Sequence, residues 1–283
     1  MKVPIRKVAF AATLRPTPAS GLASLLALSL GAFAPSGTAA AEASRDPNVM
    51  SNVIALGAGA RPEYEGADHL SSVPILAARF GRGHRYLFLR GPSLSANVLD
   101  RPDLELGPLL NRDLGRDADI DSEAVAALGE IDATTELGGF VAWHPAFVGG
   151  AFGLRLEALR DAGDVHDSWR SNVAVSHSAL PSARWSVETE LSASIVGDDY
   201  ARTYFSVDET GAALSGLERF DADGGLHDVG LGVNLRYALN RRLSLSGLLS
   251  RRQLLGDAAD SPIVTEEGNA GQTFVAASLG WRF

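Results

Sequence analysis

Apolar and polar residues alternate with a period of two along most of the chain, most clearly in its second half. Successive side chains of a β-strand point to opposite faces, so this period predicts strands with one apolar and one polar face. In one such segment Val229, Leu231, Val233, Leu235 and Tyr237 alternate with Gly230, Gly232, Asn234, Arg236 and Ala238.

The pattern predicts about twelve strands, most of them long enough for the ~9–11 residues of a tilted membrane-spanning strand. An even number is usual for bacterial single-chain barrels. The pattern is weakest before residue 112, where ten or fourteen strands in total remain possible. The predicted ranges are 52–64, 72–80, 85–99, 103–112, 131–144, 147–160, 168–178, 185–196, 200–207, 226–238, 242–254 and 272–283.

We expect these strands to form a single closed antiparallel transmembrane β-barrel. Alternation also fits a soluble barrel, in which the apolar face points inward. A lipid-facing barrel is favoured by polar faces made mostly of Gly, Ser and charges of both signs, and by a last strand that ends on Phe283. Lipid cannot satisfy the hydrogen bonds of an open strand edge, so the sheet must close.

The N-terminus has the features of an export signal. Lys2, Arg6, Lys7 and Arg15 precede an apolar run over 21–34, and small residues before Ala41 predict cleavage there. We therefore expect a signal peptide over 1–41, a short segment over 42–51 and a barrel domain over 52–283. A buried N-terminal helix is the alternative. No later run is apolar enough for a membrane helix.

The amino-acid composition excludes further classes of protein. The chain has no Cys, which excludes a disulfide scaffold and a Cys-ligated metal site. Without residues 1–41 the chain keeps 21 basic residues, all Arg, and a net charge near −13. Such acidity argues against nucleic acid as a partner.

Several short motifs follow one another in a recognisable order. Residues 57–68 read Gly-Ala-Gly-Ala-Arg-Pro-Glu-Tyr-Glu-Gly-Ala-Asp, and Val73-Pro74 opens the next predicted strand. Phe88-Leu89-Arg90-Gly91-Pro92, Leu106-Gly107-Pro108 and Glu136-Leu137-Gly138-Gly139-Phe140 come later. From about residue 52 to Trp281-Arg282-Phe283 the chain resembles the MltA-interacting protein family, also called the MipA/OmpV family, of outer-membrane proteins.

The resemblance implies a place in the cell outer membrane. It also implies a scaffold role, in which the barrel joins a lytic transglycosylase to a bifunctional penicillin-binding protein during peptidoglycan growth. Other members look like adhesins or stress-response proteins. The outer-membrane assembly machinery is expected to read the C-terminal Phe283. The family has no established catalytic residues, so none is carried over.

The sequence offers no convincing catalytic set, metal site or cofactor site, and we expect no enzyme. Six histidines stand apart, without the spacing of a zinc site. A hydrolase whose catalytic residues come together only in the folded chain remains an alternative. The family motif Pro62, Glu63, Tyr64, Glu65 and Gly66 reads as a strand end and turn. Tyr64 suits a membrane interface, and a solvated loop is favoured over a ligand role for the two glutamates.

If the apolar faces point outward, a set of charged side chains points into the lumen. Such charges pair and close a barrel or line a narrow aqueous pathway. A small-solute pore is therefore the alternative to the scaffold. The expected lumen charges are Glu136, Arg155, Glu157, Glu188, Glu190, Arg236 and Arg252.

Loop lengths predict the sidedness of the barrel, since periplasmic turns are short and external loops are long. With Phe283 on the periplasmic side, 255–271 and 208–225 are long and external. Counting further back then puts the long segment 113–130 on the periplasmic side. We take 113–130 as a candidate surface for a periplasmic partner, with a lumen plug or a miscounted strand as alternatives. A short helix capped by Ser122 is expected within it.

Overall fold

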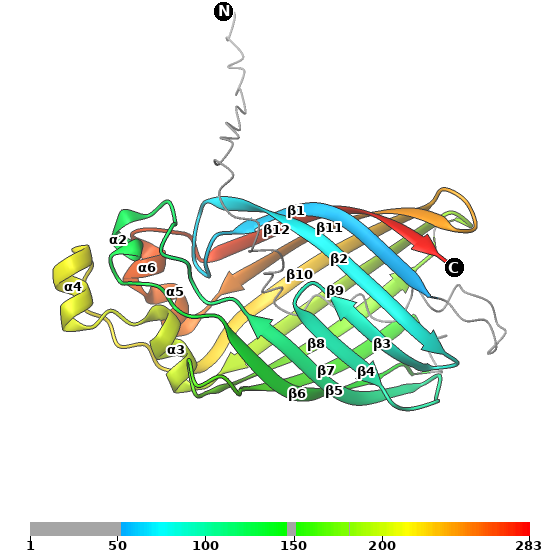
Figure 1. Cartoon of the computed structure of the whole chain (residues 1–283), viewed down its shortest axis with the longest axis horizontal. Coiled ribbons are helices and arrows are strands. Elements are labelled where there is room, and N and C mark those ends of the chain that lie inside the picture. The colour runs from blue at the N-terminus through cyan, green and yellow to red at the C-terminus, as the bar shows by residue number, and fades with distance from the viewer. Residues whose placement is uncertain (1–51, 146–150, 181) are drawn as a thin grey trace, which may run out of the picture.

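The alternating strands close into one antiparallel barrel (Figure 1). The computed structural model describes residues 52–145, 151–180 and 182–283. Each strand pairs with its neighbours in sequence, and β1 closes the barrel on β12. The strands are β1 (Val53–Pro62), β2 (Leu70–Arg82), β3 (Arg85–Arg90), β4 (Ser93–Asn97), β5 (Leu104–Asp113), β6 (Thr134–Trp143), β7 (Phe152–Asp161), β8 (Trp169–Ala179), β9 (Trp185–Val196), β10 (Gly225–Ala238), β11 (Leu243–Leu254) and β12 (Gly271–Arg282).

Large apolar side chains cover the outside of the barrel. Leu191, Leu231 and Leu249 are each more than half exposed, while their neighbours Glu190 and Ser250 are buried inside. An exposed apolar surface of this extent marks contact with a membrane or another protein, and a continuous belt around a closed sheet is the lipid-facing surface of a transmembrane barrel. No helix among the described residues has the length and apolar character to cross a membrane.

The count of twelve strands is confirmed, but two of the predicted ranges are wrong in ways that cancel. The range 85–99 is two short strands, β3 and β4, because Gly91 adopts a positive φ of 52° and Pro92 follows it in the turn. The range 200–207 is instead mostly helical, within α3 (Asp198–Phe205). Tyr200, Ala201, Tyr204 and Phe205 lie on one buried face of this helix.

These two corrections change the sidedness of the first half of the chain. The predicted periplasmic position of 113–130 is wrong, because removing the false strand at 200–207 moves this segment to the same end as 255–271. Both described ends of the chain, Asn52 and Phe283, lie at the opposite end, where the Phe283 N–H donates to the Asn52 carbonyl. With the short turns on the periplasmic side, every helix of the described chain lies on the external side.

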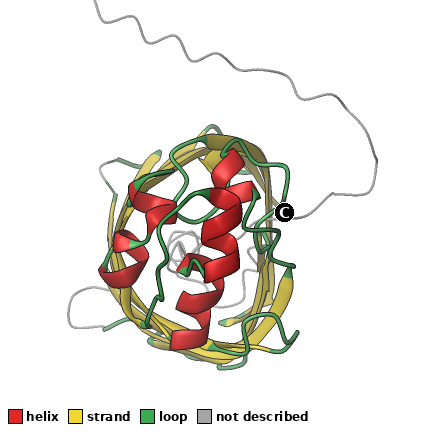
Figure 2. Ribbon diagram, turned by 90° about the vertical axis from the view of Figure 1, so that its left-hand side faces the viewer, coloured by secondary structure: helices red, strands yellow, loops and turns green. Residues whose placement is uncertain are grey.

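Five short helices of the described residues lie across the external mouth (Figure 2). Their cores are two clusters, one built on Tyr200, Tyr204, Phe205 and Leu254, the other on Tyr64, Val125, Val207 and Ile263. We call this layer the cap. Ser122 accepts from the Val125 N–H, so the helix start expected there is confirmed. The cap helices are α2 (Glu123–Ala126), α3, α4 (Glu209–Ser215), α5 (Gly256–Asp260) and α6 (Pro262–Thr265).

The short β3–β4 hairpin leaves the external half of β2 without a second neighbour. Pairing of β2 with β3 starts at Ala77, and the Gly91 N–H donates to the Leu76 carbonyl. Backbone groups of alternate residues point to the same side, so Pro74 directs its backbone toward the unpaired edge. Since proline has no N–H, one donor fewer is left unsatisfied there.

Placing a charge on the lipid-facing belt tests the orientation of the barrel. Leu249 lies near the middle of β11 and is 55% exposed. Leu249→Arg is expected to lower the free energy of unfolding by about 2–4 kcal/mol in a bilayer. Leu214→Arg, on the exposed helix α4 outside the belt, is the control and should leave the free energy of unfolding unchanged. Urea titration in phosphatidylcholine vesicles measures both, and equal values would contradict the lipid-facing assignment.

Candidate functional site in the barrel lumen

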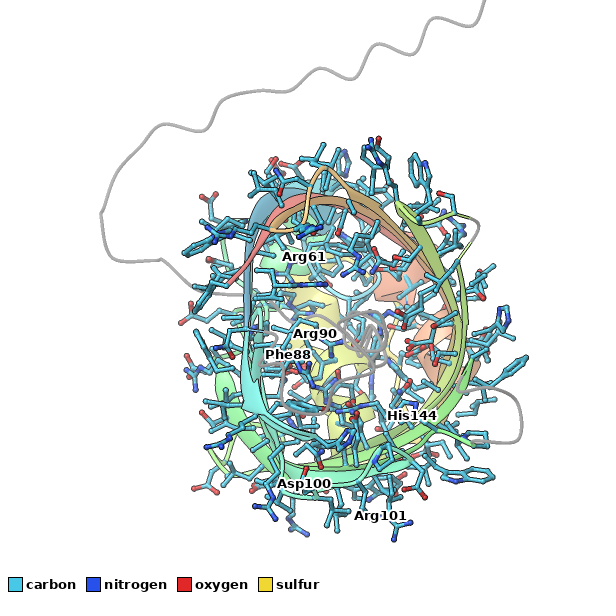
Figure 3. The ribbon with its side chains drawn as sticks, turned by 90° about the vertical axis from the view of Figure 1, so that its right-hand side faces the viewer. Arg61, Phe88, Arg90, Asp100, Arg101 and His144 are labelled. Atoms are coloured by element: carbon cyan, nitrogen blue, oxygen red, sulfur yellow. The ribbon has the colours of Figure 1, made fainter. Side chains whose placement is uncertain are left out.

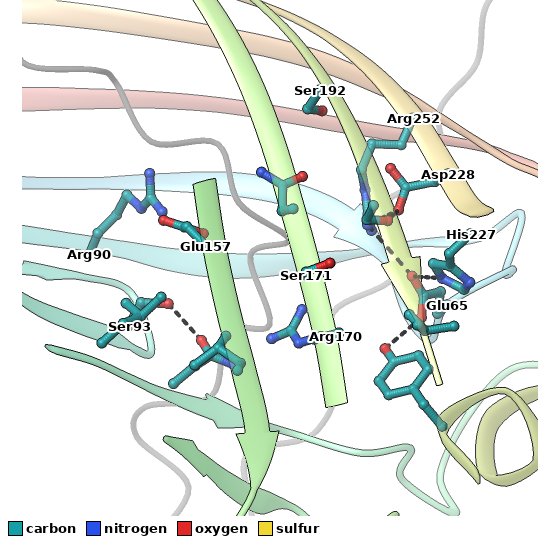
Figure 4. Close-up of a pocket in the computed structure, with 17 residues that line it drawn as sticks. Glu65, Arg90, Ser93, Glu157, Arg170, Ser171, Ser192, His227, Asp228 and Arg252 are labelled. Atoms are coloured by element: carbon teal, nitrogen blue, oxygen red, sulfur yellow. Dashed lines mark hydrogen bonds and ion pairs between the residues drawn. The ribbon is translucent and has the colours of Figure 1, made fainter. Parts of the chain in front are cut away.

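The turn after β1 folds inward and places Glu65 inside the barrel (Figure 4). Gly66 has a φ of 103°, which favours glycine, and a Cβ there would lie 2.6 Å from Val264 Cγ2. The Gly66 N–H donates to Gln272 Oε1 at 3.2 Å. The turn is therefore held from both the cap and β12.

Glu65 joins three elements that are distant in sequence. The Tyr200 hydroxyl of α3 donates to Glu65 Oε2 at 3.1 Å. His227 Nε2 of β10 lies 3.1 Å from Glu65 Oε1, and Arg252 Nη1 of β11 lies 3.6 Å from the same oxygen. We call Glu65, Tyr200, His227 and Arg252 the latch. It ties the β1–β2 turn and the cap to the barrel wall.

The charge of Glu65 is stabilised by its partners. Burial on its own raises the pKa of this carboxyl, but His227, Arg252 and the Tyr200 hydroxyl together hold its pKa well below the ordinary value of a glutamate. Burial also raises the pKa of Tyr200 well above its ordinary range, so its hydroxyl stays a donor. The latch is therefore a charge-assisted network at neutral pH.

The lowered pKa of Glu65 predicts how the latch responds to acid. A carboxyl whose pKa is lower in the folded than in the unfolded protein stabilises the fold at pH values above its unfolded-state pKa of ~4.3. That stabilisation is lost only as the pH falls through the folded-state pKa. The difference in unfolding free energy between the protein and Glu65→Gln should thus stay constant from pH 7 to about pH 5 and persist in part below pH 4. Urea titrations across this range measure it. A difference that disappears by pH 5 would contradict the network.

The other residues of the family motif pack or form hydrogen bonds within the turn and the cap. Pro62 ends β1, and Glu63 Oε2 accepts from the Asp121 N–H at 3.0 Å. The expected interface position of Tyr64 is wrong, because its ring is buried in the cap and its hydroxyl donates to the Glu267 carbonyl at 3.2 Å. That burial raises its pKa to about 12. The solvated-loop interpretation also fails for Glu65, whose side chain is only 16% exposed.

A second buried network lies beside the latch and centres on Glu136 of β6. Arg170 of β8 donates to both its oxygens, at 2.7 and 2.5 Å, and Asn111 Nδ2 of β5 donates at 2.7 Å. His166 Nε2 lies 3.6 Å away. Glu136 is fully buried, so this bidentate pair fixes three strands across the lumen.

The expected lumen charges all lie on inward-facing positions of their strands. Glu136 and Arg252 belong to the two networks just described. Arg155 donates from Nε to Glu157 Oε1 at 2.6 Å, halfway along the barrel. Seen from the terminal end, Arg90 also lies inside the ring of strands, as does Arg61 (Figure 3). The remaining expected charges are Glu188, Glu190 and Arg236, on β9 and β10.

Two cavities meet at the latch. One extends into the lumen and is lined by Arg90, Glu157 and Ser192. The other lies beneath the cap and is lined by Arg61, Asp113 and Arg116. Glu65, Tyr200, Arg170 and Arg252 line both. These four side chains therefore separate the lumen from the space under the cap.

Comparison with known families agrees with this arrangement of strands and turn. The family model described as MltA-interacting protein MipA matches residues 54–283, the whole described barrel apart from its first residues. The chain belongs to the MipA family. As a transmembrane β-barrel of that family, it lies in the outer membrane.

Solved structures with similar folds share little sequence with this MipA-family chain. An outer membrane channel from Pseudomonas putida F1 is 12% identical, with 86% of this chain and 98% of that chain covered and a TM-score of 0.41. The NanC porin is 6% identical, with coverage of 83% and 100% and a TM-score of 0.40. The CymD monoaromatic hydrocarbon channel is 10% identical, with coverage of 82% and 88% and a TM-score of 0.41. No curated protein matches the sequence.

Sequence reasoning missed two residues in the latch region of this chain, His227 and Asp228. They are adjacent, yet both are buried, because the pairing of β10 with β9 shifts register between Leu226 and Asp228. Such a β-bulge turns two neighbouring side chains to one side. The alternating pattern alone assigns them to opposite faces, so only the pairing reveals the site.

The ligand atoms of Glu65, His227 and Asp228 lie within 4.8 Å of one another, a spacing that suits a metal ion. Arg252 Nη1, however, lies 3.3 Å from Asp228 and 3.6 Å from Glu65. A guanidinium between two carboxylates already offsets part of their charge and competes with a cation. Nor is this a hydrolase set, because the Ser194 hydroxyl donates to Asp228 rather than to His227.

Proposed function

We propose that this MipA-family barrel is a narrow aqueous pathway for small polar solutes, closed toward the outside by the Glu65 latch. The observation that carries the proposal is the pair of cavities that meet at Glu65, Tyr200, Arg170 and Arg252. A charged lumen wall with a charge-paired turn between two cavities supports a pathway that can be closed.

The charges of the lumen support a pathway rather than a solid core. Most inward-facing side chains of the strands are polar or charged, as in a barrel whose lumen holds water. The apolar clusters of the lumen are small: Val73 with Phe274, and Leu109 with Phe140 and Leu159. Most of the larger apolar packing belongs to the cap.

Planar-bilayer recording of the purified barrel tests this function. We expect discrete conductance steps from single barrels, with an amplitude that changes when Arg155 or Glu157 in the middle of the lumen is neutralised. A bilayer that stays silent while the inserted barrel is verified by protease protection would refute the pathway.

A second candidate is a scaffold role, favoured by the match to a family described as MltA-interacting. We propose a lytic transglycosylase, and with it a bifunctional penicillin-binding protein, as the partner. The correction of 113–130 to the external side moves the contact to the short periplasmic turns, such as 239–242 between β10 and β11. Co-purification from envelope extract, with and without alanine at Asn240 and Arg241, tests it. Neither candidate function requires catalysis by this chain.

We further propose that residues 1–41 are removed during export and that Phe283 is read during assembly. Residues 1–51 lie outside the described part of the chain. N-terminal sequencing of the protein from outer membranes is expected to begin at Glu42. An N-terminus at Met1 would contradict the signal peptide.

A further inference from the structure

Two arginines face each other across the β2–β3 turn, which lies at the same end of the barrel as Phe283 (Figure 1). Arg82 and Arg85 are direct partners in the antiparallel pairing, so their side chains leave the hairpin on one face, about 5 Å apart at Cβ. Gly83, with a φ of 62°, takes the first position of the two-residue turn between them, where a type II′ turn favours glycine. Both arginine side chains are exposed.

The charges of this arginine pair are not balanced within the described chain. Like charges directly opposite each other on a hairpin repel and destabilise it. Two carboxylates follow in the next turn, but Asp100 accepts from the His84 N–H at 3.0 Å and Asp103 is paired with Arg101 at 2.7 Å. No carboxylate of the described residues forms an ion pair with either member of the pair. An anion bound between the two guanidinium groups therefore offsets a repulsion that the chain itself leaves in place.

The arginine pair lies at the edge of the lipid-facing belt. The next pair along the same face of the hairpin is Phe80 with Leu87, which are 44% and 45% exposed. The Phe80 ring packs edge-on against Phe283 with 6.3 Å between ring centroids, and Phe283 stacks on Trp281 at 4.8 Å. Exposed aromatic rings gather at the interface between a membrane and water. The guanidinium groups, two residues further along each strand toward the periplasm, therefore lie at the depth of the lipid headgroups.

Exposed basic side chains gather at this periplasmic end, although the chain as a whole is acidic. At the external end exposed carboxylates dominate the cap and the loops, such as Asp119, Asp199 and Glu209. The two signs of charge are thus separated along the barrel axis, and the net charge of the chain does not describe its periplasmic rim. The exposed arginines of that rim are Arg82, Arg85, Arg101, Arg184, Arg241 and Arg242.

We propose that the Arg82–Arg85 pair binds the headgroup of an anionic phospholipid in the periplasmic leaflet. A guanidinium group binds phosphate in bidentate fashion and is more weakly hydrated than an ammonium group, which suits the edge of a bilayer. The phosphate lies between the two arginines, and the acyl chains lie along Phe80 and Leu87. A zwitterionic headgroup brings its own cation next to the pair and gains less, so the site selects lipids with a net negative charge. The site is outside the lumen and does not depend on conduction.

Native mass spectrometry of the protein purified from outer membranes tests the site, in detergent with equimolar phosphatidylglycerol and phosphatidylcholine of the same chain length. A basic residue near a membrane surface contributes about 1 kcal/mol toward an anionic lipid, which is about fivefold in affinity. For the pair we therefore expect phosphatidylglycerol to be retained about 30-fold over phosphatidylcholine as the first bound lipid. Equal retention of the two lipids would overturn the proposal.

Two single variants assign the preference to the pair. Arg82→Gln and Arg85→Gln should each reduce it about fivefold, and the double variant should lose most of it. Arg219→Gln, exposed on the cap between α4 and β10, removes the same charge at the other end of the barrel and should change nothing. Each variant is checked for folding by its heat-dependent gel mobility, and if one single variant fails to fold, the other decides.

Two further outcomes would contradict the lipid site. A folded double variant that keeps the full preference would mean that the other arginines of the rim attract the lipid. Glycerol phosphate, which is a headgroup without acyl chains, distinguishes a free phosphate from a lipid. If it is retained as strongly as phosphatidylglycerol, the apolar pair of Phe80 and Leu87 contributes nothing and the ligand is not a lipid.

Discussion

Glu65→Ala is expected to convert a mostly closed barrel into a mostly open one in planar-bilayer recordings. The substitution removes the contacts to Tyr200, His227 and Arg252 together. Hydrogen bonds to a charged group contribute about 1.5–3 kcal/mol each and are not additive. A loss of about 2–3 kcal/mol shifts the ratio of closed to open barrels by about 30–150-fold. The open probability of single barrels measures this ratio.

A matched control lies in the same turn. Asp68 pairs with His69 at 2.8 Å, but both side chains are more than half exposed, so the pair contributes little. Asp68→Ala should leave the open probability unchanged. If Glu65→Ala and Asp68→Ala behave alike, the latch does not control the pathway.

Glu136→Ala is expected to cause the largest loss of stability among single substitutions in the lumen. Removing the carboxylate leaves the Arg170 guanidinium inside the barrel without its bidentate partner. Breaking a buried ion pair in this way costs about 3–5 kcal/mol. The midpoint of the heat-dependent shift in gel mobility, together with urea titration in vesicles, measures the loss.

The conservative variant separates charge from hydrogen bonding. Glu136→Gln keeps an acceptor for Arg170 and should cost less than the alanine variant, while Glu209→Ala on α4 should be neutral. An alanine variant as stable as the unmodified protein would mean that Arg170 finds another partner, which would contradict the fixed network across β5, β6 and β8.

The faces of the strands could be predicted from the sequence because parity is a local property. Once Leu191 points to lipid, Glu190 must point to the lumen, whatever the rest of the chain does. The inward positions of Arg155 and Glu157 follow in the same way. Long-range pairing is not needed for any of these residues, so the sequence was sufficient for them.

The latch could not be predicted in this way, since it depends on contacts between distant segments. Glu65 reaches Tyr200 and His227, more than 130 residues away, and a β-bulge turns His227 inward. Similarly, α3 has an apolar face that a short window confuses with strand alternation. Gly91-Pro92, by contrast, is a local turn signal, so the division of 85–99 into two strands is accessible from the sequence.

The central claim, that water fills the lumen, is tested most directly by cysteine accessibility on β9. The chain has no native cysteine, so single substitutions report cleanly. Ser192 lines the lumen cavity, and its neighbour Leu191 is 63% exposed on the lipid-facing side. A charged, membrane-impermeant thiol reagent is expected to modify Ser192→Cys and reduce its single-channel current, while Leu191→Cys stays unmodified. Failure of the reagent to reach Ser192→Cys, or modification without any change in current, would contradict the aqueous pathway.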